Sequence, residues 1–542
     1  MNFIETIFQH LSAKPNQAFV SEVHGERIVP TNGSSMLSLI GGARSALRAE
    51  GVKPGDRVVL LASNSARWVA ADLAILAEGA ICVPMYARQA PNELVAMMKD
   101  CGASLILCAT PELLSAVKEA GATAKGVVFD ELFAAPSLDA TVAARKGDDP
   151  ATLVYTSGTS GDAKGAILTI SNIDYMLPVT RDALRDLMGT ASGPNERVFH
   201  YLPFCFAGSR MVLWTCLFRG GGILVSTNLD NLAVEMKTAQ PNYFLNVPAL
   251  LERIKKGVEG KIADQSRFAR GLYEKGKAAY AKKLQGRANA ADEAMLAIAK
   301  KLVFSRVRAQ LGKDLICLIC GSAPLSEDTQ RWFEMIGLPV HQVYGLTETT
   351  AIVTMDRPAS TVPGRVGHVI PGCEVKLGES DELLVRGPNI FAGYWKRDEA
   401  SKNAFLDGWF RTGDQVELDA SGNLRVIGRV GNVLVPESGH NVAPEPIEQS
   451  LLEHLPKAEH AVVVGHGRPF LAAIVTGKVA REDVESALEI VNAALPHYRR
   501  IRKFYVAKEP LTIESGLLTA NQKLRRRAIE AHFKDAMKEM YT

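Results

Sequence analysis

One stretch of the sequence combines the residue types that bind phosphate. After the apolar run 153–155 comes Thr156-Ser157-Gly158-Thr159-Ser160-Gly161-Asp162-Ala163-Lys164-Gly165, with three glycines, four hydroxyl side chains and one lysine. Backbone N–H groups of glycines can turn towards an anion, hydroxyl groups add donors, and Lys164 supplies a positive charge. Ala163 stands where a Walker A loop has glycine, so this motif is of another kind. A flexible surface loop has no need of these residues behind a buried strand, and we therefore predict a phosphate-binding loop.

The elements that must position this loop are predicted by the apolar pattern. Short apolar runs alternate with helical periodicity over the first two thirds of the chain, which predicts parallel α/β layers. The runs are residues 57–61, 80–84, 104–108, 222–225, 243–245 and 315–320. From Gly364 onward, frequent Gly and Pro separate short strands such as 383–385, which predicts a small β-barrel-like subdomain.

A chain of 542 residues exceeds what one hydrophobic core organises, so at least two domains are expected. Mixed helix and strand patterns return near Arg429. We therefore predict an α/β fold whose large N-terminal domain, residues 1–428, holds two layered α/β subdomains and the β-barrel-like subdomain. A small α+β C-terminal domain is predicted over residues 429–542.

The order of the motifs resembles that of the adenylate-forming superfamily of acyl-CoA synthetases, nonribosomal peptide adenylation domains and luciferases. Residues 155–165 are similar to that family's phosphate-binding motif, and the other motifs follow in order over nearly the whole chain. The resemblance implies that ATP, Mg²⁺ and a carboxylic acid form an acyl-adenylate, and that the acyl group then passes to coenzyme A. It also implies that the C-terminal domain is mobile and rotates between the two steps.

Two further motifs are similar to those that surround the adenine and the α-phosphate in this family. They are Gly321-Ser322-Ala323-Pro324 and Tyr344-Gly345-Leu346-Thr347-Glu348. The resemblance implies that Tyr344 stacks on the purine. It also implies that Thr347 donates to the α-phosphate and that Glu348 holds Mg²⁺, since a carboxylate is the ligand type of a hard cation.

Later positions complete the implied site. Asp414 ends the motif 407–414 and would accept hydrogen bonds from the ribose hydroxyl groups, as an ionised carboxylate can. Arg429 would lie near the ribose and phosphate, and Lys523 would stabilise charge as the carboxylate attacks the α-phosphate. Gly431 stands at the interdomain hinge where the family has Asp or Lys, which eases backbone rotation. From the residues alone, Arg429 and Lys523 are also compatible with solvated surface positions.

The thiol and acyl sites are the last parts that the resemblance implies. The segment Ser438-Gly439-His440-Asn441 is similar to the loop that lines the pantetheine tunnel, so Ser438, Gly439 and His440 are predicted to bind coenzyme A. Residues 304–312 and 468–470 are typical of the long-chain fatty acyl-CoA synthetase branch. An apolar tail needs an apolar pocket, for which Phe206, Phe244 and Val247 are candidates. They fit a protein core equally well, and Phe206 replaces a His that is frequent in the family.

The resemblance thus implies a CoA ligase of a medium- or long-chain fatty acid, and two alternatives stay open. The enzyme could pass its acyl group to the phosphopantetheine of a carrier protein. A basic patch for the 3′-phosphate of free CoA would argue against this, and residues 499–503 are a candidate patch. The chain could also be an inactive relative that binds lipid or acts as a scaffold, although such a protein would have no reason to keep the charged residues of the site. These are Lys164, Glu348, Asp414, Arg429 and Lys523.

The overall charge is small and unevenly distributed. The net charge of +3 does not indicate a nucleic-acid partner. Residues 253–308, however, contain 15 Lys and Arg against 5 Asp and Glu. Such a basic helical segment can meet an anionic membrane surface, although a solvated helix face is the simpler interpretation.

The remaining features predict a cytoplasmic protein. No signal peptide is recognisable at 1–5 and no apolar run reaches the ~20 residues that span a bilayer. The eight cysteines are scattered, and Cys317 and Cys320 lie in an apolar run without a second pair for zinc, so reduced thiols are expected. Peripheral membrane contact and a homodimer are left open by the sequence.

Overall fold

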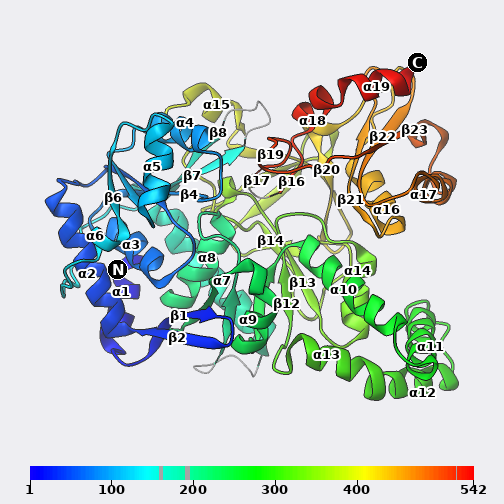
Figure 1. Ribbon diagram of the computed structural model, residues 1–542, viewed down its shortest axis with the longest axis horizontal. Helices are drawn as coiled ribbons and strands as arrows, with labels where there is room; N and C mark the ends of the chain where they lie inside the picture. The colour runs from blue at the N-terminus through cyan, green and yellow to red at the C-terminus, as the bar shows by residue number, and fades with distance from the viewer. Residues whose placement is uncertain (158–162, 190–195, 520–521) are drawn as a thin grey trace.

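The first of two large sheets is built of six strands in the order β6-β5-β3-β4-β7-β8 (Figure 1). The computed structural model describes residues 1–157, 163–189, 196–519 and 522–542. Five of these strands run parallel, and only β8 is antiparallel to its neighbour. The bounds are β3 (Arg57–Leu61), β4 (Ile81–Met85), β5 (Leu105–Cys108), β6 (Lys125–Val128), β7 (Pro150–Ser157) and β8 (Ala163–Thr169).

The second sheet has nine strands in the order β15-β14-β13-β12-β11-β9-β10-β1-β2, with a parallel central part. Its strands are β1 (Ala18–His24), β2 (Arg27–Asn32), β9 (Val198–His200), β10 (Ile223–Ser226), β11 (Tyr243–Asn246), β12 (Leu318–Cys320), β13 (Val340–Tyr344), β14 (Thr354–Met355) and β15 (His368–Val369). The predicted strand 57–61 is therefore confirmed as β3. The predicted strand 315–320 is shorter, because only its last three residues pair with β13.

Helices form layers between and outside the two sheets. The largest core lies between the sheets, where it is filled by α1 (Phe3–Ala13), α2 (Gly33–Ala49), α3 (Ala66–Ala77), α7 (Ile170–Met188) and α8 (Ala207–Phe218). The outer face of the first sheet is covered by α4 (Pro91–Cys101) and α5 (Pro111–Glu119). The outer face of the second sheet is covered by α9 (Leu232–Ala239), α10 (Pro248–Ala263), α11 (Arg267–Leu284), α12 (Ala290–Ala299), α13 (Ser305–Gly312) and α14 (Glu327–Met335). The order helix, sheet, helix, sheet, helix is that of layered α/β proteins.

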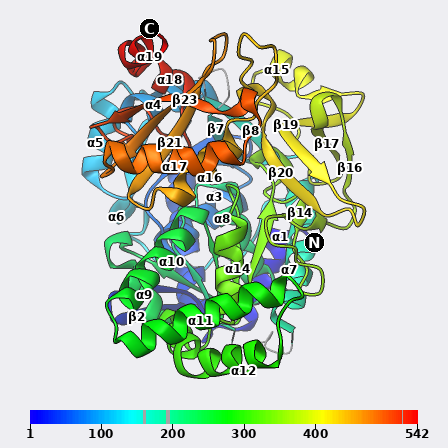
Figure 2. The ribbon, with the colours of Figure 1, turned by 90° about the vertical axis from the view of Figure 1, so that its right-hand side faces the viewer.

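The rest of the chain forms a curled half-barrel sheet and a small α+β region (Figures 1 and 2). The half-barrel contains β16 (Glu374–Leu377), β17 (Glu382–Arg386), β18 (Phe405–Leu406), β19 (Trp409–Leu418) and β20 (Leu424–Arg429), with α15 (Asp398–Asn403) beside it. The C-terminal sheet contains β21 (Ala458–Val464), β22 (Leu471–Gly477) and β23 (Ile501–Ala507). Its helices are α16 (Glu445–His454), α17 (Arg481–Ala493), α18 (Arg526–His532) and α19 (Lys534–Tyr541). The predicted fold class is confirmed.

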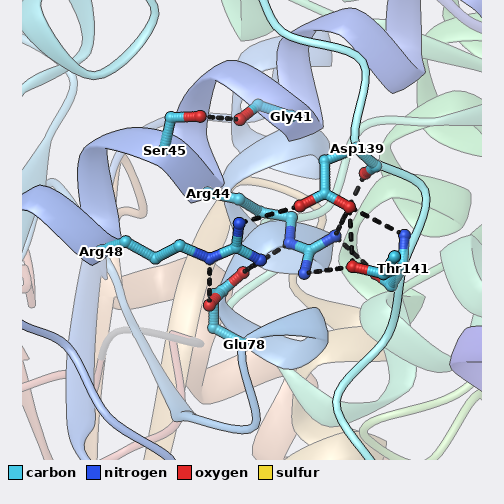
Figure 3. Close-up of polar contacts among 7 residues, drawn as sticks. All are labelled: Gly41, Arg44, Ser45, Arg48, Glu78, Asp139 and Thr141. Carbon is cyan, nitrogen blue, oxygen red and sulfur yellow. Dashed lines mark hydrogen bonds and ion pairs between the residues drawn. The ribbon is translucent and has the colours of Figure 1, made fainter.

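A buried ion network fixes the segment that returns from β6 to β7 (Figure 3). Arg44 on α2 donates to Glu78 at 2.6 Å and pairs with the Asp139 carboxylate at 3.1 Å. Arg48, one turn later, pairs with the same two carboxylates. Gly41 is required beside this network, because a Cβ there would lie 2.0 Å from the carbonyl oxygen of Ser137. The network therefore holds the chain against α2 just before it enters the strand that carries the predicted phosphate loop.

Candidate active site

The predicted adenine and ribose residues meet where the nine-stranded sheet approaches the half-barrel. Tyr344 ends β13, and its hydroxyl donates to Asp414 Oδ2 at 2.6 Å. Arg429 ends β20 directly opposite Asp414 on β19, and its Nε lies 2.9 Å from Asp414 Oδ1. Dehydration and the charge of Asp414 raise the pKa of the Tyr344 hydroxyl, which stays neutral and donates. Three residues that are far apart in the sequence thus form one connected corner.

The turns after β12 and β13 lie side by side, since these two strands are paired in parallel. A Cβ on Gly321 would lie 2.8 Å from the side chain of Val343, and one on Gly345 would lie 2.2 Å from the carbonyl of Ala351. Ser322 adopts a left-handed conformation with φ of 74°, which is unusual outside glycine. Ser322, Ala323 and Pro324 are exposed, so this turn presents its surface to a ligand at the C-terminal edge of the strands.

Lys164 is positioned by a hairpin and by an aromatic residue that the sequence reasoning missed. In the β7–β8 pair Lys164 lies opposite Thr156, and its Nζ is 5.3 Å from the centre of the Tyr394 ring. The Tyr394 hydroxyl donates to Glu348 Oε1 at 2.9 Å. Tyr394 therefore connects the lysine of the phosphate loop with the predicted Mg²⁺ ligand. Its only sequence signal is the aromatic and glycine pattern of residues 391–395.

Part of the predicted phosphate loop lies outside the described residues. Gly158, Thr159, Ser160 and Gly161 belong to the undescribed segment 158–162. The last described pair of the hairpin joins the backbones of Ser157 and Ala163.

Glu348 lies in the short 3₁₀ turn Thr347–Thr349 and is 8% exposed. Its Oε1 accepts the Tyr394 bond, while Oε2 has no hydrogen-bond partner within the described part of the chain. One carboxylate that keeps an oxygen for a cation suits Mg²⁺, which takes one or two carboxylates and completes its shell with phosphate oxygens and water. The residues present therefore fit Mg²⁺ bound together with a nucleotide, held by Glu348.

Lys523 faces the same corner from the C-terminal region. Hydrogen bonds from Gln522 and Lys523 to Thr519 fix the turn that carries it. Its side chain is exposed. Dehydration and then the charge of Arg429 lower the pKa of Lys523, against the opposing effect of Asp414 and Glu348. The charges that Lys523 meets are thus those of the predicted nucleotide site.

The hinge and the predicted thiol loop lie at the start of the C-terminal region. A Cβ on Gly431 would meet no atom within 4 Å, so packing does not require glycine there. Ser438, Gly439 and His440 lie in an exposed loop, and the His440 ring stacks on Tyr498 with centroids 4.2 Å apart. Arg499 lies over the same Tyr498 ring. The fold therefore brings the predicted CoA loop next to the basic run 499–503.

The three candidate acyl-pocket residues do not come together on one face. Phe206 is half-buried at the start of α8, and its ring centre lies 5.9 Å from that of Tyr86. Phe244 is 1% exposed and packs among the helices on the outer face of the nine-stranded sheet. Val247 caps the start of α10. Phe244 has the packing of a core residue, which is the alternative that its sequence left open.

The sheets, the curled half-barrel and the small C-terminal region define the class of this protein as an adenylate-forming α/β fold. Residues 40–395 match the AMP-binding enzyme family, and residues 431–542 match the AMP-binding enzyme C-terminal domain. The chain belongs to the AMP-binding enzymes, a family of AMP-forming acid–thiol ligases. Of its helices in the described residues, none combines the length and apolarity needed to cross a membrane.

Two curated relatives align over most of the chain. The long-chain-fatty-acid–CoA ligase FadD15 of Mycobacterium bovis is 27% identical, over 100% of this chain and 97% of its own. The long-chain-fatty-acid–CoA ligase ACSBG2 of Rattus norvegicus is 25% identical, over 92% of this chain and 86% of its own.

Two solved structures share the fold. One is the o-succinylbenzoate coenzyme A synthetase MenE from Bacillus subtilis in complex with AMP, with a TM-score of 0.75, 20% identity, and coverage of 96% of this chain and 97% of that one. The other is ATP-bound MatB from Rhodopseudomonas palustris, with a TM-score of 0.75, 22% identity, and coverage of 99% and 100%.

Proposed function

We propose that this protein is an AMP-forming fatty acid–CoA ligase, with an N-terminal domain over residues 1–428 and a C-terminal domain over 429–542. The observation that carries the proposal is the convergence of Lys523, from the C-terminal region, on the corner formed by Tyr344, Asp414 and Arg429. Tyr344 comes from the nine-stranded sheet, Asp414 and Arg429 from the half-barrel, and Lys523 from the C-terminal region. The names of the relatives FadD15 and ACSBG2 support a long-chain acid as the substrate.

In the first half-reaction a carboxylate oxygen of the acid attacks the α-phosphorus of ATP. The bond from that phosphorus to the bridging oxygen breaks, so pyrophosphate leaves and acyl-AMP remains. Asp414 accepts from the ribose, while Lys164 and the phosphate loop hold the leaving group. Lys523 lies between two anions as they approach, and its cation lowers the cost of bringing them together. Mg²⁺, when bound to Glu348, neutralises phosphate charge.

In the second half-reaction the thiol sulfur attacks the acyl carbon, the carbon–oxygen bond to AMP breaks, and the thiol proton goes to solvent. Rotation about the hinge at Gly431 withdraws Lys523 and brings the loop 438–441 to the site. The stack of His440 on Tyr498 supports free CoA as the acceptor, because it sets four basic side chains beside this loop. These are Arg499, Arg500, Arg502 and Lys503.

The experiment that tests the proposal is pyrophosphate release from ATP and Mg²⁺ across acids from acetate to long-chain fatty acids, benzoates and cinnamates, each with and without CoA. We expect turnover to peak with a fatty acid and to require CoA. Turnover that is the same with and without CoA would instead favour a carrier-protein acceptor. No pyrophosphate release with any acid would contradict the proposal and favour an inactive relative.

A further inference from the structure

The basic segment noted in the sequence folds into a helical hairpin at the edge of the molecule (Figures 1 and 2). We define the basic hairpin as residues 267–306, which cover α11, α12 and the single π-helical turn Lys300–Phe304. It contains ten Lys and Arg and three Asp and Glu. The two helices run antiparallel, because Lys282 pairs with Asp292 and Lys283 with Glu293 at their joined ends.

The hairpin is firmly anchored on its inner side. Within the hairpin, Gly276 packs so closely against the second helix that a Cβ there would lie 2.5 Å from Ala299. The Trp332 indole on α14 donates to the Tyr273 hydroxyl at 2.8 Å, and that hydroxyl donates to Glu259. Leu296 and Phe304 are buried in the same cluster. Because its inner side is packed against the rest of the protein, the hairpin holds its outer side in a fixed position.

That outer surface carries large apolar side chains. Phe268 is 75% exposed, Ile298 47% and Leu302 40%. Ile298 and Leu302 are one turn apart and share one side of their helix. Counting about 100° per residue, Phe268 lies about 70° from the centre of the buried residues of α11, whereas Ile298 and Leu302 lie about 130° and about 90°, in the same rotational sense, from the centre of Leu296 and Ala299 on the second helix. When the buried sides of two antiparallel helices face each other, displacements in the same rotational sense point to one side of the pair. Phe268, Ile298 and Leu302 therefore share a face.

The hairpin that carries these apolar side chains also carries exposed positive charge. Lys275, Lys300 and Lys301 are exposed and have no ion-pair partner among the residues that the structure describes. Arg267, Arg270 and Arg306 are also exposed. A rigid helical surface with a few protruding apolar side chains, set in diffuse positive charge, matches the interface of an anionic bilayer. There the apolar groups enter between headgroups and the cations meet lipid phosphates.

We propose that the basic hairpin docks this protein peripherally on anionic lipid membranes, with Phe268, Ile298 and Leu302 inserted below the headgroups. The charge complementarity is specific to this part of the chain, because the net charge of the whole protein is only +3. The inference is independent of the substrate of the enzyme.

The test is flotation of the full-length protein with vesicles of equal parts phosphatidylcholine and phosphatidylglycerol, compared with phosphatidylcholine alone. We expect binding to the anionic vesicles only, with a decrease as salt screens the charges. The variant Lys275→Gln/Lys300→Gln/Lys301→Gln should bind on the order of 100-fold more weakly, given the attraction of each cation to an anionic surface. The variant Phe268→Ser/Ile298→Ser/Leu302→Ser should lose at least about tenfold.

Matched controls distinguish vesicle binding through the basic hairpin from nonspecific adsorption of the protein. The apolar control is Leu138→Ser/Leu406→Ser/Ile490→Ser, at exposed positions outside the hairpin. The charge control is Lys478→Gln/Lys508→Gln/Lys534→Gln. Both should bind like the wild type, and all four variants should keep its thermal unfolding midpoint. Equal losses in the controls would overturn the proposal. A wild-type protein that does not bind anionic vesicles would also overturn the proposal. That result would favour an acidic protein as the partner of this surface.

Discussion

At the scale of single residues, Lys523 is the side chain on which adenylate formation most depends. We predict that Lys523→Ala slows adenylate formation by about 100- to 1,000-fold, the usual effect of removing one group that stabilises transition-state charge. Thioester formation from supplied acyl-AMP should be unchanged. ATP–pyrophosphate exchange and CoA consumption measure the two half-reactions. The exposed neighbour Arg527 supplies a control, since Arg527→Ala should retain both activities. Equal loss of both in Lys523→Ala would contradict the role.

Asp414 is predicted to accept hydrogen bonds from the ribose hydroxyl groups, in addition to its contacts with Tyr344 and Arg429. Loss of hydrogen bonds to a charged group should weaken ATP binding to Asp414→Ala by roughly 10- to 100-fold. A structural role alone could also weaken binding, so ATP and 2′-deoxy-ATP should be compared by calorimetry. The wild type should prefer ATP, whereas Asp414→Ala should bind both about equally. A variant that keeps the preference would show that Asp414 does not contact the ribose.

Asp356 makes the stability of the fold depend on pH. It is 2% exposed, its Oδ2 accepts from the backbone of Gln342 at 2.7 Å, and burial raises its pKa to about 7. An unfolded Asp titrates near 3.9. Between about pH 4 and pH 7 the folded state keeps a proton that the unfolded state has lost, so the contribution of Asp356 to stability falls as pH rises.

Asp356→Asn should remove this dependence, because an amide stays neutral at every pH. We expect the variant to be more stable than the wild type by about 2–4 kcal/mol at pH 8 and by little at pH 4. Denaturant unfolding at both pH values gives the two differences. A variant that follows the wild type in parallel across this range would contradict the assignment.

At the scale of elements, the ion network of Figure 3 shows how a helix positions the strand before the phosphate loop. Arg44 is 2% exposed, whereas the neighbouring Arg48 is 48% exposed although it contacts the same carboxylates. Removing one partner of a buried pair leaves an uncompensated charge, so Arg44→Met should cost about 3–5 kcal/mol. Arg48→Met should cost at most about 1 kcal/mol. Urea unfolding measures both, and similar shifts for the two variants would contradict a buried network.

At the scale of the whole molecule, an ion pair joins the C-terminal region to the first sheet. Arg525, two residues after Lys523, donates to Glu93 on α4 through both terminal nitrogens at 2.9 Å. Both side chains are about one third exposed, so the pair is expected to bias the orientation of the C-terminal region rather than fix it. In this orientation Lys523 faces Asp414 and Glu348, which is the arrangement that adenylate formation needs.

Arg525→Ala should therefore slow adenylate formation about two- to fivefold and leave thioester formation from acyl-AMP unchanged or faster. The swapped pair Glu93→Arg/Arg525→Glu should restore the first rate, because it restores the attraction. Single-turnover kinetics of each half-reaction provide the comparison. Failure of the swap to restore adenylate formation would show that Arg525 acts in another way.

The sequence by itself determined the layered α/β class, the strand 57–61 and the order of the motifs. These follow from apolar periodicity and from turn residues, which are signals between near neighbours in the chain. It also identified Lys164, Tyr344, Asp414, Arg429 and Lys523 as candidates, because each stands in a short motif.

Only the tertiary structure decided which of these residues meet, and on which face. The bond from Tyr344 to Asp414 crosses two sheets, and Tyr394 reaches Glu348 across 46 positions, so neither has a local signal. Phe206 and Phe244 are equally apolar, yet Phe206 lies at the start of α8 beside Tyr86, whereas Phe244 packs among the helices outside the nine-stranded sheet. Such choices depend on the packing of whole layers, because a side chain's surroundings are set by elements distant in the sequence.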